Sequence, residues 1–322
     1  MIIDFSAHII SRDALGKMLE SRQYYGPDKG KCELPYPPQN ADPKVRIGLM
    51  EKYEIDMQLL SQTTPVLLGF PPEEAAKICR VSNDNIADLC EKYPAKFVGA
   101  AVISLLDVGT ALEELDRTVK DLGFKCVTIS SNQNGKGLDS QEYYPFYEKL
   151  VNYDIPIFLH PTHWESYPLV DMKQGWRFMH IFGWPFDTTQ AVWRMIFGGV
   201  LDRFPNLKIV THHLGAMLPY FSHRIALNVQ SFLQDKLRRP LSEYWNQIYG
   251  DSALDGTAEA FPCGYAFFGS DRMLFGTDYP FGPEAGEIFI KDNLAGIKTM
   301  AIPQEDREKI LGENAKRLLK IK

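Results

Sequence analysis

Histidines at the ends of apolar segments are the residues of this chain best suited to chemistry. His8 ends the first apolar segment, His160 ends IPIFLH, and Asp278 follows RMLFGT. His212 and His213 end a fourth segment, LKIVTHH. Neutral imidazole nitrogens and a carboxylate bind zinc, manganese or iron, and three protein ligands leave positions for water and substrate. The pattern predicts a metal site, provided that the fold brings these segment ends together.

Each of these residues also has an ordinary structural explanation. A single histidine is more often a surface or hydrogen-bonded structural group than a ligand, and an aspartate after a glycine is common in turns. Three of the seven histidines, His163, His180 and His223, fall in predicted loops or helices. The hypothesis of a metal site therefore depends on the four histidines that coincide with strand ends.

The opening segment MIIDFSAH contains an unusual feature. Side chains alternate along a strand, so we expect Asp4, Ser6 and His8 to lie on one face. Metal ligands are expected on that face, yet a neutral serine is a poor ligand. The segment is compatible with a working metal site, a rebuilt one, or none.

Short β-rich segments alternate with longer amphipathic ones along the chain. About eight strands with helices between them, over 322 residues, are typical of a distorted (β/α)8 barrel, in which the carboxyl ends of the strands meet on one face. A doubly wound open sheet is the alternative, but no glycine-rich turn follows the first strand. We expect a single domain over residues 1–322, with Asp187 or Thr188 as the N-cap of the helix after the fifth strand.

Two long loops follow predicted strands and would lie over the catalytic face. They span residues 9–42 and 161–187, and the second contains five aromatic residues, namely Trp164, Trp176, Phe178, Trp184 and Phe186. Such rings would cap a flat substrate, or would pack against helices or a neighbouring subunit. We take Trp164, Phe186 and Tyr279 as candidate substrate-binding residues.

Composition narrows the range of partners. The formal net charge is −6 and there is no basic block, which argues against nucleic acid or an anionic membrane as partner. No apolar run approaches the roughly 20 residues that span a bilayer, so we expect a cytoplasmic protein that binds small molecules. The five cysteines lack CxxC spacing, which indicates neither a disulfide framework nor a cysteine zinc site.

Several motifs together resemble one family. They are IFLHP, THHLGAMLPYFSHR, LFGTDYPF, GGVLDRFPNLKIV and KILGENAKRLLKI, and further blocks such as DPKVRIGLMEKYEID extend the match over almost the whole chain. The chain resembles the amidohydrolase superfamily, in the branch of aminocarboxymuconate-semialdehyde and resorcylate-type hydroxybenzoate decarboxylases. The resemblance implies a distorted (β/α)8 barrel and one divalent metal, for which we expect zinc, with manganese or iron as alternatives.

The resemblance also implies a set of metal ligands. His160 and Asp278 match metal-binding residues of the fifth and eighth strands, and His8 matches the second histidine of an Asp-x-His-x-His opening. Ser6 stands where the muconate-semialdehyde decarboxylases have a histidine ligand and the resorcylate type has a glutamate. We expect His8, His160 and Asp278 to hold the metal, with water, substrate or Asp4 in the remaining place. A degenerate site without metal is the alternative.

Further roles follow from the resemblance. His213 matches the acid/base histidine of an HxG motif, and imidazole exchanges protons near neutral pH. Ala216 replaces a glutamate of the resorcylate type, which removes a partner of that histidine. Arg224 matches an arginine that binds the substrate carboxylate across a dimer interface; a structural salt bridge is the alternative. The resemblance implies a homodimer, with His213 and Asp278 as the catalytic residues.

The leading hypothesis is a metal-dependent, non-oxidative decarboxylase of an aromatic, heteroaromatic or unsaturated carboxylic acid, without an organic cofactor. The segment LPYPPQN lacks a second carboxylate-binding arginine of the muconate-semialdehyde branch, which disfavours a dicarboxylate substrate. The alternative is a metal-dependent hydrolase or hydratase acting on an ester, lactone, amide or C–C bond, because metal-bound water can attack on the same scaffold. A third hypothesis is a non-catalytic binding protein.

Overall fold

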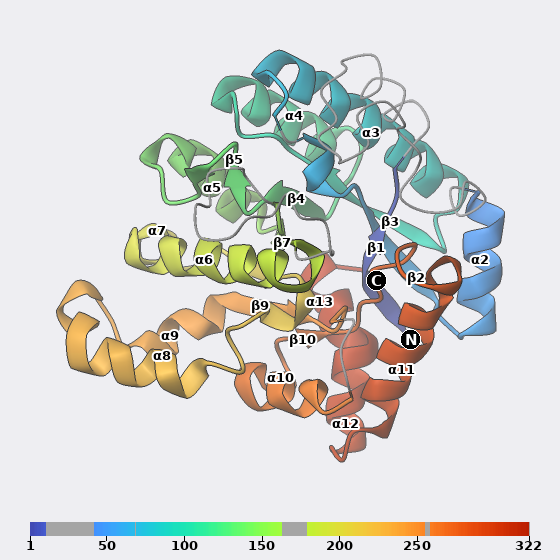
Figure 1. Ribbon diagram of the computed structural model, residues 1–322. Coiled ribbons are helices and arrows are strands. Elements are labelled where there is room, and N and C mark those ends of the chain that lie inside the picture. Colours follow the sequence, from blue (N-terminus) through green and yellow to red (C-terminus); the bar gives the residue numbers. More distant parts are fainter. Residues whose placement is uncertain (11–41, 68, 163–178, 255–257, 322) are drawn as a thin grey trace.

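An eight-stranded parallel sheet forms the centre of the protein in the computed structural model, which describes residues 1–10, 42–67, 69–162, 179–254 and 258–321 (Figure 1). Its strands follow one another in chain order: β1 (Ile3–His8), β2 (Met57–Ser61), β3 (Phe97–Val102), β4 (Cys126–Ser130), β7 (Ile157–His160), β8 (Ile209–Thr211), β9 (Ile248–Asp251) and β10 (Met273–Leu274). A small antiparallel hairpin, β5 (Asn132–Gln133) and β6 (Lys136–Gly137), follows β4.

The sheet closes on itself through backbone hydrogen bonds between β1 and the segment that starts after β10. The amide of Phe5 donates to the carbonyl of Phe275 at 2.9 Å, and the amide of Asp278 donates to the carbonyl of Ser6 at 2.9 Å. The amide of His8 donates to the carbonyl of Tyr279 at 2.6 Å. The sequential strand order and this closure confirm the predicted (β/α)8 barrel and exclude the doubly wound sheet.

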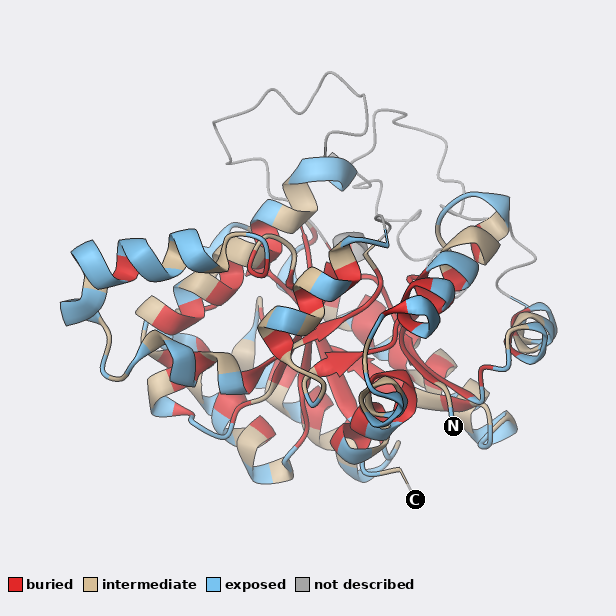
Figure 2. Ribbon diagram, turned by 90° about the horizontal axis from the view of Figure 1, so that it is seen from below, coloured by how far each residue is buried: buried red, intermediate tan, exposed pale blue. Residues whose placement is uncertain are grey.

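Helices surround the barrel and present their exposed faces to solvent (Figures 1 and 2). They are α2 (Pro43–Lys52), α3 (Pro72–Lys92), α4 (Val108–Lys120), α5 (Tyr144–Tyr153), α6 (Trp184–Phe197), α7 (Val200–Arg203), α8 (Ser222–Asn228), α9 (Leu241–Tyr244), α10 (Ala260–Phe268), α11 (Glu287–Thr299), α12 (Gln304–Glu308) and α13 (Asn314–Leu319). None of the helices in these ranges combines the length and hydropathy needed to cross a bilayer.

Helix starts follow local sequence chemistry in some places and tertiary contacts in others. Asp42 caps α2 by accepting a hydrogen bond from the amide of Lys44 at 2.8 Å. The prediction that Asp187 or Thr188 caps the helix after the fifth strand is wrong, because α6 already begins at Trp184. The buried Asp187 carboxylate instead accepts from the amide of Thr162 at 3.0 Å and so ties α6 to the end of β7.

Two apolar layers hold the barrel together. The outer layer packs strand residues such as Leu60 and Leu159 against helix residues such as Leu115 and Val192. The second layer lies inside the barrel at the beginnings of the strands, and we call it the inner apolar layer. Its members are Ile3, Phe5, Met57, Leu59, Ala100, Cys126, Phe158, Val210 and Leu274, together with Ala315, Leu318 and Leu319 of α13. Because α13 contacts both β1 and β10, it covers this end of the barrel.

A β-bulge interrupts β1. Asp4 pairs with Gln58 and Ala7 pairs with Leu60, so β1 uses one residue more than β2 over this stretch. Phe5 and His8 therefore both reach the ring of Phe158, with centroid distances of 5.7 and 6.0 Å. The expectation of strict alternation, with Asp4, Ser6 and His8 on one face, is wrong for this reason.

Candidate metal centre

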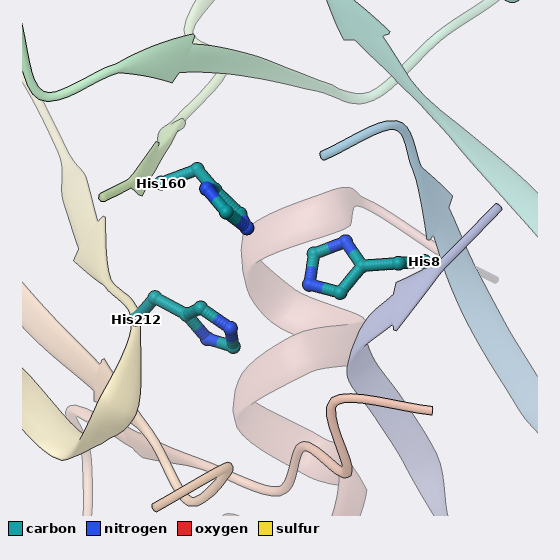
Figure 3. Close-up of side chains that lie close together, drawn as sticks. All are labelled: His8, His160 and His212. Atoms are coloured by element: carbon teal, nitrogen blue, oxygen red, sulfur yellow. The ribbon is translucent and has the colours of Figure 1, made fainter. Parts of the chain in front are cut away.

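Three buried histidines meet inside the barrel at the carboxyl ends of the strands. His8 ends β1, His160 ends β7 and His212 follows β8. Each offers one ring nitrogen, and these nitrogens all lie within 4.8 Å of one another. The three rings point toward a common centre (Figure 3). The structure thus brings together two of the predicted ligands, His8 and His160, with one that was not predicted.

The strands position these rings by placing each one shortly after a residue of the inner apolar layer. His160 comes two residues after Phe158, and His212 comes two residues after Val210. Strand side chains repeat their direction every two residues, so the same inward face continues from apolar to polar. In β1 the bulge extends the spacing from Phe5 to His8 to three residues.

Each of the three rings is held through Nδ1 by an oxygen outside the cluster. His8 Nδ1 lies 2.9 Å from Ser61 Oγ, and His160 Nδ1 lies 2.8 Å from the Pro161 carbonyl. His212 Nδ1 lies 2.6 Å from Asp251 Oδ2. Metal-binding histidines in proteins typically use one nitrogen for such an outer partner, which leaves the other nitrogen free for the metal.

Asp278 lies against two of the histidines. Its Oδ1 is 3.2 Å from His8 Nε2 and 3.3 Å from His212 Nε2. Asp278 adopts a left-handed backbone conformation, with φ of 59°, which is uncommon for a residue other than glycine. With His212 and His213 it forms a second group whose ligand atoms lie within 4.8 Å of one another.

His213 stacks on its neighbour His212, with ring centroids 3.8 Å apart. It has a left-handed backbone with φ of 54°, so two consecutive side chains reach the same region instead of opposite faces. Its other face lies parallel to Trp184, at a centroid distance of 6.2 Å. In contrast to His212, the buried Nδ1 of His213 has no hydrogen-bond partner among the described residues.

Burial and neighbouring charges set the protonation of the cluster. Burial lowers the pKa of His8 and of His160 below the usual imidazole value, so both rings are neutral at pH 7. Burial and the nearby His212 lower the pKa of His213 to about 3. Burial also disfavours a charge on His212, but the carboxylates of Asp251 and Asp278 raise the pKa of His212 to about 10. Burial favours the protonated form of Asp278, but the interaction with His212 and the close contact with His8 outweigh burial and hold the pKa of Asp278 well below its usual range.

Ser6 and Asp4 both lie outside these groups. Ser6 Oγ is buried without a hydrogen-bond partner in the described structure, and it lies in the space that a side chain on Gly276 would need. The Asp4 carboxylate accepts hydrogen bonds from Thr277 Oγ1 at 2.7 Å and Gln58 Nε2 at 2.9 Å. Asp4 is thus engaged by Thr277 and Gln58, and it is not part of either group of candidate ligands among the described residues.

The predicted substrate-binding residues fall in different environments. Arg224 is exposed on α8, and Phe186 is 45% exposed on α6. Tyr279 is fully buried, with the guanidinium of Arg46 4.6 Å from its ring centroid. Trp164 and the predicted loop residues 11–41 and 163–178 lie outside the described residues.

The donor set fits a divalent cation. His8 Nε2 is buried and makes no well-directed hydrogen bond, although Asp278 Oδ1 is 3.2 Å away. Such an orphaned ring nitrogen, facing two other imidazoles and an ionised carboxylate, suits a metal that binds nitrogen and oxygen ligands. The residues present are therefore sufficient for one ion.

Comparison with known proteins agrees with this geometry. The family model described as Amidohydrolase matches residues 3–321. The chain belongs to the amidohydrolase family. The resemblance inferred from its motifs is confirmed.

Several proteins to which the chain is similar are named decarboxylases. The 2-amino-3-carboxymuconate-6-semialdehyde decarboxylase of Dictyostelium discoideum is 32% identical, over 85% of this chain and 75% of the relative. A gamma-resorcylate decarboxylase of a Rhizobium species is 29% identical, over 86% of each chain. A solved dihydroxybenzoic acid decarboxylase from Polaromonas, with bound manganese and the inhibitor 2-nitroresorcinol, has a TM-score of 0.81 at 25% identity and covers 99% of this chain and 97% of its own.

Three residues of this region are missing from the sequence-based site. The motifs favour His213 over His212, they give Asp251 no role, and they place Trp184 in the loop of residues 161–187. A signal for His212 was present: it lies two residues after Val210, as His160 lies two residues after Phe158. Asp251 ends β9, and polar residues at that position of a barrel strand are candidates for the site.

Proposed function

We propose that this amidohydrolase is a metal-dependent, non-oxidative decarboxylase of an aromatic, heteroaromatic or unsaturated carboxylic acid. The observation that carries the proposal is the buried convergence of His8, His160, His212 and Asp278 at the carboxyl ends of the strands. The relatives described above support the reaction type, because their names specify decarboxylases of aromatic or unsaturated acids.

His8, His160 and Asp278 would hold one divalent metal. When bound, such a cation stabilises negative charge that develops on a substrate carboxylate and a neighbouring oxygen. Two imidazoles or more in the ligand set favour zinc or iron over manganese in intrinsic affinity, and zinc remains our first proposal. The manganese in the Polaromonas structure makes manganese the main competitor.

The protein's own side chains would bind the substrate and move one proton. In the reaction the bond between the ring carbon and the carboxylate carbon breaks, its electron pair stays on the ring carbon, and carbon dioxide leaves. A proton must then reach that carbon. We propose His213 for this transfer, because its buried Nδ1 has no partner among the described residues and its ring lies beside Trp184. Its pKa of about 3 leaves the ring neutral at pH 7, so His213 would relay a proton taken up during the reaction and would not hold one at rest. Asp278 is the second candidate for this proton.

Arg224 would bind the carboxylate of a substrate that lies in the active site of a partner subunit. It is exposed on α8, and exposed apolar residues lie near it in sequence: Tyr220, Leu227 and Phe232 are 80%, 48% and 75% exposed. An exposed apolar surface of this kind suits a subunit contact, which supports a homodimer. We also propose that residues 1–322 form a single domain and that the protein is cytoplasmic.

The experiment is a screen of hydroxybenzoic and related unsaturated acids for carbon dioxide release. We expect turnover that falls at least about 100-fold in His213→Ala and in Asp278→Ala, in the range of a lost acid/base group. Full activity of both variants would overturn the proposal. Incorporation of labelled oxygen from water into the organic product, without carbon dioxide release, would identify the hydrolase or hydratase instead.

A further inference from the structure

We infer that His212 is itself a ligand of the metal and supplies the side chain that Ser6 does not. The inference rests on the metal site of the proposed function and changes its composition. The site would then consist of three histidines from β1, β7 and the end of β8, together with Asp278. His213, the next residue, would lie beside the metal site without being a ligand.

Position is the first argument. His212 belongs to both groups of ligand atoms that lie within 4.8 Å of one another, whereas the trio of His8, His160 and Asp278 does not form such a group in the described part of the chain. His212 Nε2 also shares Asp278 Oδ1 with His8 Nε2, at 3.3 and 3.2 Å. A cation at the centre of this cluster therefore cannot reach the predicted ligands without lying close to His212.

Orientation is the second argument. The Nδ1 atoms of His8, His160 and His212 are all engaged by oxygens outside the cluster. For His212 the partner is the fully buried carboxylate of Asp251, which fixes the ring and directs Nε2 inward. His213 directly follows His212 in the sequence, but its Nδ1 has no such partner in the described structure. His212 is thus oriented as a metal ligand, whereas His213 is not.

The alternatives to His212 are occupied or unsuitable. Ser6 offers a neutral hydroxyl that packs against Gly276, and Asp4 is held by Thr277 and Gln58. His8 and Asp278 already contribute from the neighbouring elements. Among the described residues of the cluster, His212 is therefore the side chain best placed to complete the set.

The test measures metal binding rather than turnover. We would determine zinc and cobalt(II) affinity by competition with a chromophoric chelator for the parent, His212→Ala and the matched neighbour His213→Ala. We expect His212→Ala to bind at least about 100-fold more weakly, because loss of an outer partner alone costs 10- to 100-fold. His213→Ala should keep one equivalent with affinity within about 3-fold of the parent. Equal affinity of His212→Ala and the parent would overturn the inference.

A second measurement does not depend on the folding of the His212 variant. In the cobalt(II)-loaded parent, each ligand histidine held through Nδ1–H gives one paramagnetically shifted N–H proton resonance. Three such resonances that persist in His213→Ala are expected, and two in the parent would overturn the inference.

Failure of the inference and failure of the proposed function give different results. If the parent binds one metal and releases carbon dioxide, but shows only two ligand histidines, the decarboxylase proposal stands and the role of His212 falls. If the parent binds neither zinc, cobalt nor manganese, both fall together.

Discussion

The same strands contribute apolar side chains to one end of the barrel interior and polar side chains to the other. At the beginnings of the strands, the inner apolar layer packs Phe5, Phe158 and Val210 against α13. Two or three residues later, the same strands present His8, His160 and His212 at the other end, which we call the polar rim. The rim also contains Asp251 and Asp278, and all five of its residues are buried.

The difference shows how one scaffold separates stability from reactivity. Burial of an apolar ring stabilises the fold by about 1.5 to 3 kcal/mol, whereas a buried polar group destabilises it unless it is paired. The rim pairs His212 with Asp251 and Asp278, and it pairs His8 and His160 with Ser61 and the Pro161 carbonyl. It leaves His8 Nε2 without a well-directed partner. The unpaired nitrogen destabilises the fold, and burial of the inner apolar layer on the same strands offsets this loss.

The largest effect should come from the inner apolar layer. Phe158→Ala removes a fully buried ring that contacts Phe5, so we expect the free energy of unfolding to fall by about 3 to 5 kcal/mol. Denaturant unfolding of the chelator-treated protein measures this loss. The folded fraction should still bind metal. Unchanged stability of the variant would show that the inner apolar layer does not stabilise the barrel as proposed.

The next effect belongs to the rim. His160→Ala should weaken metal binding at least about 100-fold, which is close to 3 kcal/mol, because it removes a ligand and its link to Pro161. Since bound metal stabilises only the folded state, a chelator should lower the melting temperature of the parent and leave that of the variant unchanged. An equal response of both proteins would contradict the proposed ligand role.

A smaller effect is expected one step outside the ligands. Asp251→Asn keeps an oxygen that can accept the hydrogen bond from His212 Nδ1 but removes the charge. We expect metal affinity to fall about 10- to 100-fold, as for other outer partners of ligand histidines. Competition with a chelator measures the change, and Ser61→Ala beside His8 gives a matched comparison on the opposite side of the rim.

The smallest effect should come from a carboxylate outside the barrel. Hydrogen bonds from Lys149 and Tyr153 hold the pKa of Asp116 below its usual range, and the group is partly exposed. A depressed pKa stabilises the fold above the unfolded pKa of about 3.9, and this stabilisation is lost as the pH falls toward the folded value. Asp116→Asn should cost less than about 1 kcal/mol at pH 7 and flatten the acid limb of a stability curve. A loss comparable to that of Phe158→Ala would contradict the comparison.

The sequence was sufficient for the fold and for most of the rim. Apolar segments separated by amphipathic ones predict strands and helices in the right order, and a barrel then brings His8 and His160 together and places Asp278 beside His8. The assignments depended on patterns with a period of two or 3.6 residues, which are local properties of the chain.

The errors arose where tertiary structure overrides those periods. The bulge in β1 depends on pairing with β2, and the left-handed φ of His213 depends on the turn after β8. Both change the direction of a side chain without changing the residues themselves. The contact between Asp251 and His212, rather than His213, is likewise a tertiary contact across the sheet, which the motif alone does not contain.

Closure of the barrel between β1 and the segment after β10 also sets when the site can exist. Asp4 and Thr277 bond to each other across 273 residues of chain. At roughly 5 to 20 residues per second, a ribosome needs roughly 14 to 55 seconds to add the second after the first. During that time His8 has been made while its partner Asp278 has not. The complete site can therefore bind a metal only after the last strand has been synthesised.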